Sequence, residues 1–137
     1  MSTLVLDSEA MNRLAQAHSG VKPVGVHAFM IAALETDSDV VVPAAVLSEL
    51  YRGRGYDAAL DACLKRYPGI EIIDTDRRLA KTVGHLLANQ NMGSHHHVDA
   101  CVVASAISAG GGLILTCDLD DLNQLAVDQL GVDIHAI

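Results

Sequence analysis

Aromatic side chains are almost absent from this sequence: its 137 residues include no tryptophan, one phenylalanine and three tyrosines. Because half of the residues are nevertheless hydrophobic, the core must be built from valine, leucine, isoleucine and alanine. Short aliphatic runs are typical of buried strands in a parallel sheet that helices cover. A single domain over residues 1–137 is expected, since a chain of this length buries about two-thirds of its unfolded surface.

Cysteine pairs and long apolar segments are also missing. The three cysteines are an odd number without a C-x-x-C pair, which favours a reduced chain. The first ten residues lack a basic segment, and Asp7 interrupts their apolar run, so they do not resemble a signal peptide. The longest uncharged stretch, residues 100–117, contains two serines and three consecutive glycines and is too polar to cross a bilayer. We expect a soluble, cytoplasmic protein with no membrane partner.

Basic residues are scarce as well. Nine lysines and arginines stand against seventeen aspartates and glutamates, which gives a formal charge of −8. Most proteins that bind nucleic acids carry the opposite balance, so the overall charge argues against such a ligand. An acidic protein can still handle a polyanion if its carboxylates surround divalent cations, because these reverse the local charge. Its acidity would also suit a basic protein partner.

The sequence does contain an alternation of short aliphatic runs and helical patterns, which predicts an α/β sandwich with a mostly parallel sheet. Strands are expected at residues 3–6, 40–43, 70–73, 113–115 and 132–134, with a proline cutting the second strand. Helices are expected at residues 8–18, 25–34, 44–52, 56–67, 76–89 and 119–130, and around Asp99. In such sheets, ligands bind beyond the carboxyl ends of the strands.

Two aspartates follow predicted strands. Asp7 ends the first aliphatic run, and Asp118 follows the run GGLILTC, so both are expected at the carboxyl edge of the sheet. An aspartate in this position is also a common N-cap of the next helix. Each of the two residues alone is therefore compatible with a capping role or with a ligand site.

Two more acidic residues belong to predicted helices. Glu49 lies beside the apolar stripe of VPAAVLSELYRG and could look into a cleft, although a solvated helix glutamate is the alternative. Asp99 shares a helix face with apolar residues such as Val103 and Ala106. A position in the first turn would gain from the helix dipole, but a cap needs no alignment with the core. A charge aimed at a core is costly unless it is paired, so a site role is favoured for Asp99.

Together these four acids would form a carboxylate cluster without matching cations, which protons or metal ions must neutralise. Oxygen ligands select hard cations such as Mg²⁺ or Mn²⁺. The chemistry that suits such a centre is phosphodiester hydrolysis, in which metal ions activate water and stabilise the attacking and leaving oxygens. The sequence thus predicts a metal site formed by Asp7, Glu49, Asp99 and Asp118.

Four segments, LVLDSEA, VPAAVLSELYRG, VDACVVASA and ILTCDLDDLNQLA, resemble in their order and spacing the PIN-domain ribonucleases. More closely, they are similar to the VapC-type toxins of bacterial toxin–antitoxin pairs, over essentially the whole chain. The resemblance implies a three-layer α/β/α fold and a Mg²⁺- or Mn²⁺-dependent endoribonuclease. It identifies the family's four acidic positions with Asp7, Glu49, Asp99 and Asp118. It also implies a homodimer and a cognate antitoxin, typically a small DNA-binding protein whose tail occupies the acidic groove.

Further residues are expected around this site. By the resemblance, Thr116 matches a small hydroxyl residue beside the last acid, and Asp120 and Asp121 match acids that can reach the metals through water. Arg52 and Arg54 follow the helix of the predicted site glutamate and are candidates to hold an RNA phosphate. Exposed surface charges are the alternative for these two arginines.

The run His95-His96-His97 is outside the family pattern. Three consecutive side chains cannot all face one ion, and we expect a solvated loop rather than a zinc or nickel site. The sequence gives these histidines no function.

Two other functions compete with the nuclease. A phosphatase of the haloacid-dehalogenase type also begins with an aspartate after the first strand, but it needs a second aspartate two residues later, where this chain has Glu9. The alternative from another class is a catalytically inert PIN-fold module that binds RNA or a partner. The presence of all four acids argues against an inert module.

Overall fold

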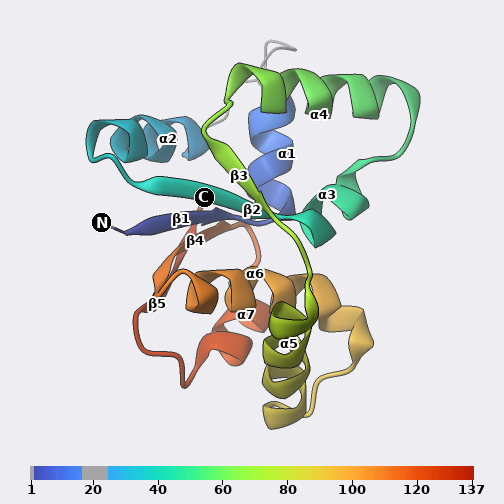
Figure 1. The fold of residues 1–137 in the computed structure, drawn as a ribbon, viewed down its shortest axis with the longest axis vertical. Helices are drawn as coiled ribbons and strands as arrows, with labels where there is room; N and C mark the ends of the chain where they lie inside the picture. Colours follow the sequence, from blue (N-terminus) through green and yellow to red (C-terminus); the bar gives the residue numbers. More distant parts are fainter. Residues whose placement is uncertain (1, 17–24) are drawn as a thin grey trace.

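The computed structural model describes residues 2–16 and 25–137. Its centre is a sheet of five strands in the order β3-β2-β1-β4-β5, in which every neighbouring pair is parallel (Figure 1). The strands are β1 (Thr3–Leu6), β2 (Asp39–Pro43), β3 (Ile70–Ile73), β4 (Gly112–Thr116) and β5 (Val132–Ala136). All five predicted strands are present, and the sheet is entirely parallel rather than mostly so.

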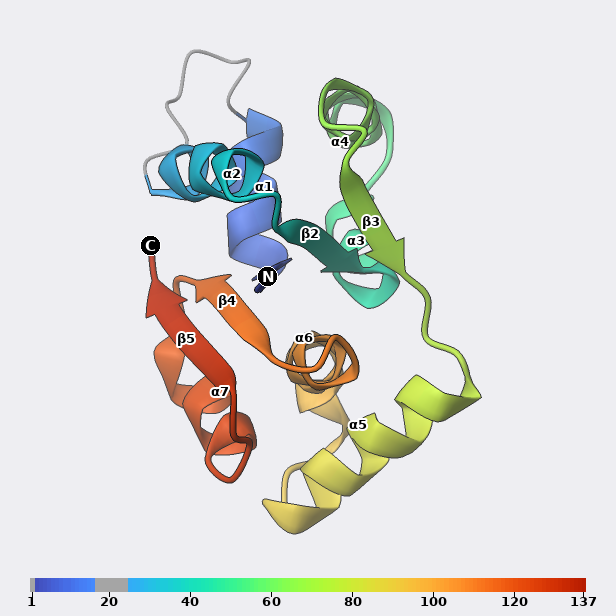
Figure 2. The same cartoon turned by 60° about the vertical axis from the view of Figure 1, so that its left-hand side comes forward.

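Helices cover both faces of the sheet. They are α1 (Ser8–Gln16), α2 (Val26–Glu35), α3 (Ala44–Leu50), α4 (Arg54–Arg66), α5 (Arg77–Asn89), α6 (His97–Ser108) and α7 (Leu119–Ala126), with a short 3₁₀ helix η2 (Ser94–His96) before α6. Helices α1, α2 and α4 lie on one face, and α5, α6 and α7 lie on the other (Figures 1 and 2). The predicted three-layer α/β/α fold is confirmed.

The three inner strands β2, β1 and β4 have few side chains in contact with water because helices pack on both faces of the sheet. All four residues of β1 are buried, and helix α6 packs across β1, β2 and β4. The core is aliphatic, as the scarcity of aromatic residues predicts, with buried leucine, valine, isoleucine, alanine and methionine side chains. Within the described ranges, the helices are all too short or too polar to cross a membrane.

The order of the strands creates a switch point beside β1. The chain passes from β1 through α1 and α2 to β2 on one side, and later reaches β4 on the other side of β1 by way of α5 and α6. The connections beyond β1 and β4 therefore lead in opposite directions, and this is where doubly wound sheets bind ligands. Residues Leu6 and Leu115 are register partners, so the ends of the two strands lie side by side at this point.

Some element boundaries differ from the predictions. Pro43 does not cut β2 but is its last residue, paired with Ile73, and its φ of −65° and ψ of 140° suit both a strand end and a proline. Helix α7 stops at Ala126 rather than at residue 130. The predicted end of the first helix, residues 17–18, lies outside the described residues.

Gly112 allows β4 to approach β1 closely. A Cβ atom on this residue would lie 2.6 Å from the carbonyl oxygen of Thr3, a distance at which the two backbones would have to separate. The glycine-rich start of β4 thus permits the strand pairing that places the ends of β1 and β4 next to each other.

Candidate metal centre at the sheet edge

Asp7 is the most buried acidic residue at the switch point. It follows β1 directly, is only 7% exposed, and its Oδ1 accepts a hydrogen bond of 2.9 Å from the backbone N–H of Ala10. Asp7 therefore caps helix α1, as one reading of the sequence expected, while its carboxylate also faces the sheet edge. Burial raises the pKa of Asp7, and the hydrogen bonds from Ala10 and from the Thr116 side chain partly oppose this rise.

Asp118 lies across the switch point, after β4. Its Oδ1 accepts a hydrogen bond of 3.2 Å from the backbone N–H of Asp120, so it caps helix α7. The fully buried Thr116 connects the two strand ends: its hydroxyl accepts a 2.9 Å hydrogen bond from the N–H of Asp118, lies 3.0 Å from the carbonyl oxygen of Asp118, and lies close enough to the carboxylate of Asp7 to lower its pKa. The predicted neighbour of the last acid thus contacts both acids.

Asp99 lies in the first turn of α6 and is partly buried. Its pKa is raised from 3.8 to about 6, first by desolvation and then by the negative charges of four other acids, in decreasing order Asp121, Asp7, Glu49 and Asp118. These five carboxylates therefore share one electrostatic environment, in which the pKa values of both Asp99 and Asp7 are raised.

Glu49 reaches this cluster from α3, which packs against both α1 and α6 at the end of β2. The residue is exposed, and its Oε2 lies 3.4 Å from the hydroxyl of Ser8, which donates a hydrogen bond to it. This contact turns the glutamate towards the start of α1. The position beside the apolar stripe of α3 thus leaves Glu49 exposed to solvent but in contact with the start of α1.

The two later acids differ from each other in the structure. Asp121 is partly buried and is the strongest charged neighbour of Asp99, whereas Asp120 is exposed and contributes its backbone N–H to the cap of α7. Asp121 also pairs with His96, whose Nδ1 lies 3.4 Å from Asp121 Oδ2. The expectation of a solvated histidine loop is correct for the exposure of His95 and His97 but wrong for the loop, because the three residues are helical, and for His96, which is partly buried beside Asp121.

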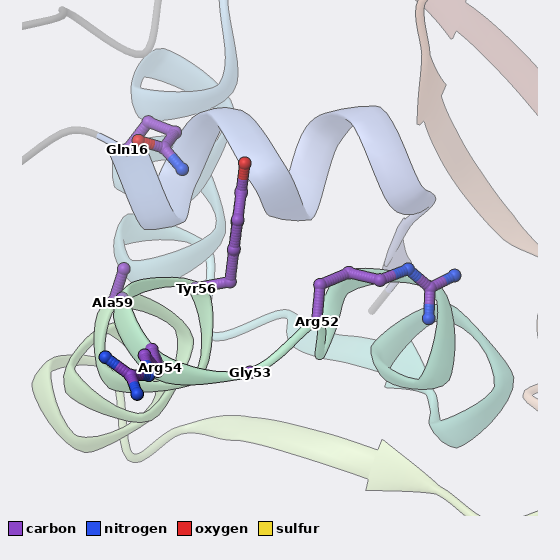
Figure 3. A pocket seen from close by; sticks show the side chains of 7 residues that line it. Gln16, Arg52, Gly53, Arg54, Tyr56 and Ala59 are labelled. Atoms are coloured by element: carbon purple, nitrogen blue, oxygen red, sulfur yellow. The ribbon is translucent and has the colours of Figure 1, made fainter.

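Arg52 and Arg54 lie along a hollow of about 630 Å³ formed with Gln16, Gly53, Gly55, Tyr56 and Ala59. Figure 3 shows their guanidinium groups pointing away from each other. Arg52 Nη1 donates hydrogen bonds to the carbonyl oxygens of Ser48, at 3.1 Å, and Tyr51, at 3.3 Å, and thereby closes the end of α3. Neither arginine contributes to the pKa shift of Asp7 or Asp99, so the acids are not neutralised by these two cations.

The donor set fits a divalent cation. Among the described residues, the ligand atoms that lie within 4.8 Å of one another belong to His96, Asp99 and Asp121. Asp7, Glu49 and Asp118 act on Asp99 through their charges, which oppose its ionisation. A hard cation such as Mg²⁺ or Mn²⁺ would convert this mutual repulsion into attraction. Residues around such a cation could position a phosphodiester and a water molecule, which is the arrangement required for phosphodiester hydrolysis.

Comparisons with known proteins agree with this arrangement. The sequence profile of the PIN domain matches residues 6–128, which include the helices and acids described above and the strands β2, β3 and β4. The chain belongs to the PIN domain family. A comparison of the sequence of this PIN domain with curated proteins finds no match.

Solved structures share the fold of this PIN domain. One is VapBC2 from Rickettsia felis, bound to a DNA fragment from its own promoter. The TM-score is 0.71, the identity is 13%, and 98% of each chain is covered. Another is DNA-bound VapBC from Salmonella typhimurium, with a TM-score of 0.67, 17% identity, and 99% of this chain and 98% of that chain covered. A third is VapBC-5 from Mycobacterium tuberculosis, with a TM-score of 0.52 and 19% identity; 100% of this chain and 98% of that chain are covered. At these identities the likeness shows a common fold.

Proposed function

We propose that this PIN domain is a Mg²⁺- or Mn²⁺-dependent endoribonuclease that acts as the toxin of a toxin–antitoxin pair. The observation that carries the proposal is the gathering of negative charge around Asp99 at the switch point of the sheet, where four other acids act on its carboxylate and its pKa rises to about 6. Such a cluster is costly for folding, and a chain keeps it most readily when a cation binds there. The fold shared with VapBC proteins supports the assignment as a toxin.

In this function, Asp7, Asp99 and Asp118 hold the metal, and Glu49 binds a metal or orients the attacking water. Asp7 and Asp118 are suited to this work because the caps of α1 and α7 fix their carboxylates in place. The bound cation would supply Lewis acidity and lower the pKa of the attacking water. Thr116 positions the two aspartates relative to each other. Because the side chains of Asp7, Thr116 and Asp118 are already fixed, they lose little conformational entropy when the cation binds.

The substrate and the partners follow from the same charges. RNA would approach through its phosphates once cations reverse the local charge, and Arg54 or the unbonded part of the Arg52 guanidinium would hold a further phosphate. A cognate antitoxin with a basic tail would be attracted to the acids around Asp99 and compete with RNA. We also propose that the protein acts in the cytoplasm as a homodimer.

The test is cleavage of total cellular RNA by protein purified free of antitoxin, with Mg²⁺, with Mn²⁺ and with chelator. Asp7→Asn is the control for contaminating nuclease, because an asparagine can still cap α1 and the domain should remain folded. Discrete fragments that require metal and disappear in Asp7→Asn are expected. Metal-independent fragments in both proteins would come from a contaminant.

The competing function is an inert PIN-fold module that binds RNA or a partner. It predicts no metal-dependent cleavage by folded, partner-free protein, together with retained RNA binding in a gel-shift assay. The negative charge around Asp99 weighs against it, because a surface that only binds RNA gains nothing from acids gathered at one point.

A further inference from the structure

His96 differs from the histidines on either side of it in what its ring faces. It is 20% exposed, and its Nδ1 lies 3.4 Å from Asp121 Oδ2. His97 instead directs its Nε2 towards the sulfur of Cys101, 3.6 Å away. The ring of His95 packs against that of His96, with a centroid separation of 4.0 Å, and helps to fix its orientation. Of the three consecutive histidines, His96 is the one that reaches the acids.

Three side chains from different segments meet at this point. One ligand atom from each of His96, Asp99 and Asp121 lies within 4.8 Å of the other two. Two neighbouring ligands of an octahedral cation at about 2.1 Å lie about 3 Å apart, so small rotations of these partly exposed side chains would close the set. The three-residue spacing of His96 and Asp99 places them on one side of the helical path, and α7 supplies Asp121.

The position of the imidazole is informative because the site is otherwise made of carboxylates. A neutral histidine adds a ligand to the cluster without adding negative charge, whereas a further acid would increase the repulsion that already acts on Asp99. An imidazole nitrogen suits transition metals more than Mg²⁺. A mixed set of this kind would therefore still accept Mg²⁺ but favour later divalent metals.

We propose that His96 is a nitrogen ligand of the metal centre and that, together with Asp99 and Asp121, it makes the site prefer Mn²⁺ and Co²⁺ over Mg²⁺. This inference rests on the proposed function in so far as it requires a metal to bind at the acidic cluster. It assigns to His96 a contact that neither the sequence pattern nor the fold predicts. Asp121 becomes a direct ligand in this arrangement instead of acting through water.

The test is pulsed EPR of the full chain loaded with Mn²⁺, which detects nitrogen bonded to the ion. A ¹⁴N signal is expected in the wild type and is expected to disappear in His96→Asn. His97→Asn is the matched control, since it makes the same substitution in the adjacent residue, whose ring faces Cys101; its ¹⁴N signal should persist. Circular dichroism of both variants establishes that they are folded.

Calorimetric titrations with Co²⁺ and with Mg²⁺ complete the experiment. Loss of a group that only supports a metal ligand costs about 10- to 100-fold in affinity, so removal of a direct ligand should weaken Co²⁺ binding at least about tenfold. Mg²⁺ binding should weaken less, and His97→Asn should change neither affinity.

The outcomes separate this inference from the proposed function. Mn²⁺ binding without a ¹⁴N signal, or a signal that survives in His96→Asn, would overturn the role of His96 and leave the nuclease intact. Absence of any bound Mn²⁺ in folded wild-type protein would overturn both. RNA cleavage by the wild type with Mg²⁺, measured in parallel, reports on the nuclease alone.

Discussion

Replacement of Asp99 by asparagine should stabilise the metal-free protein. The folded protein raises the pKa of Asp99 from 3.8 to about 6, first through burial and then through the charges of neighbouring acids. At neutral pH the ionised form is therefore held against an unfavourable free energy, which an uncharged side chain of the same shape does not experience. Asp99 would thus lower the free energy of unfolding of the metal-free protein, although the proposed function requires it.

The magnitude follows from the shift. A difference of about two pKa units corresponds to about 3 kcal/mol at neutral pH. Water reaches this partly buried carboxylate and reduces its unfavourable electrostatic free energy. Asparagine also loses about 0.3–1 kcal/mol of favourable interaction with the N-terminus of α6. The expected net gain in the free energy of unfolding is therefore about 1–2 kcal/mol, or about 3–8 °C in melting temperature.

The pH dependence gives this prediction a second readout. Because the folded protein binds the Asp99 proton more tightly than the unfolded chain does, the wild type should lose stability as pH rises from about 4 to about 6 and change little above that range. The advantage of Asp99→Asn should accordingly be largest at pH 7.5 and about half as large at pH 5.

Thermal melts in chelator at pH 5 and pH 7.5 measure both effects. Asp133→Asn is a matched control because it removes the same charge from an exposed position near the start of β5, away from the cluster; little change is expected. Added Mg²⁺ or Mn²⁺ should raise the melting temperature of the wild type more than that of Asp99→Asn. A marked loss of stability in metal-free Asp99→Asn at pH 7.5 would show that Asp99 is a structural residue and would refute this reasoning.

Three further predictions concern residues around the site. Gly112→Ala should destabilise the protein by about 2–3 kcal/mol in chemical denaturation, because the added Cβ would meet the backbone of β1. Gly84→Ala in α5 is the control: its Cβ would meet no atom within 4 Å beyond the backbone of its own helix, and it should stabilise the protein by about 0.5–1 kcal/mol. Thr116→Val should cost about 1–2 kcal/mol, since the hydroxyl bonds both strand ends, and Thr116→Ser should restore stability and cleavage. Asp121→Asn should reduce metal affinity strongly and Asp120→Asn only slightly; equal effects would contradict the difference in burial.

The strands and the order of the elements were predictable from local patterns. Runs such as 3–6 and 70–73 are aliphatic and bounded by turn residues, and the structure has strands at these positions. The carboxyl edge of a parallel sheet then identifies Asp7 and Asp118 as neighbours, whichever role each plays. Both act as helix caps in the structure, so the two interpretations that the sequence left open for each residue are compatible with each other.

Asp99 does not owe its place at the site to an apolar stripe on its helix. Seven successive residues of α6, Ala100–Ala106, are buried, so this helix has no single apolar stripe with which an aspartate could align. What distinguishes Asp99 is its place in the first turn, where the buried helix meets the sheet edge. Helix α6 is buried on all sides because α5, α7 and the sheet enclose it, and a single sequence does not reveal this enclosure.

The contact between His96 and Asp121 could not be foreseen from sequence patterns. It depends on the 3₁₀ turn before α6 and on how α7 packs against α6, and neither follows from hydrophobic periodicity. The available signal was the three-residue spacing between His96 and Asp99, which places both side chains on one side of a helix. This spacing was hard to recognise within a run of three histidines, because His95 and His97 do not face the acids.

The central claim is that the carboxylates at the switch point direct hydrolysis of RNA by a metal-activated water. The most direct measurement is the chemistry of the RNA ends left after cleavage of a defined oligonucleotide with Mn²⁺ by the wild type. Attack by water leaves linear phosphate and hydroxyl ends, and Asp118→Asn should abolish their formation. Cleavage that persists in chelator and leaves 2′,3′-cyclic phosphates would show attack by the RNA's own 2′-hydroxyl, and would contradict a metal centre at these acids.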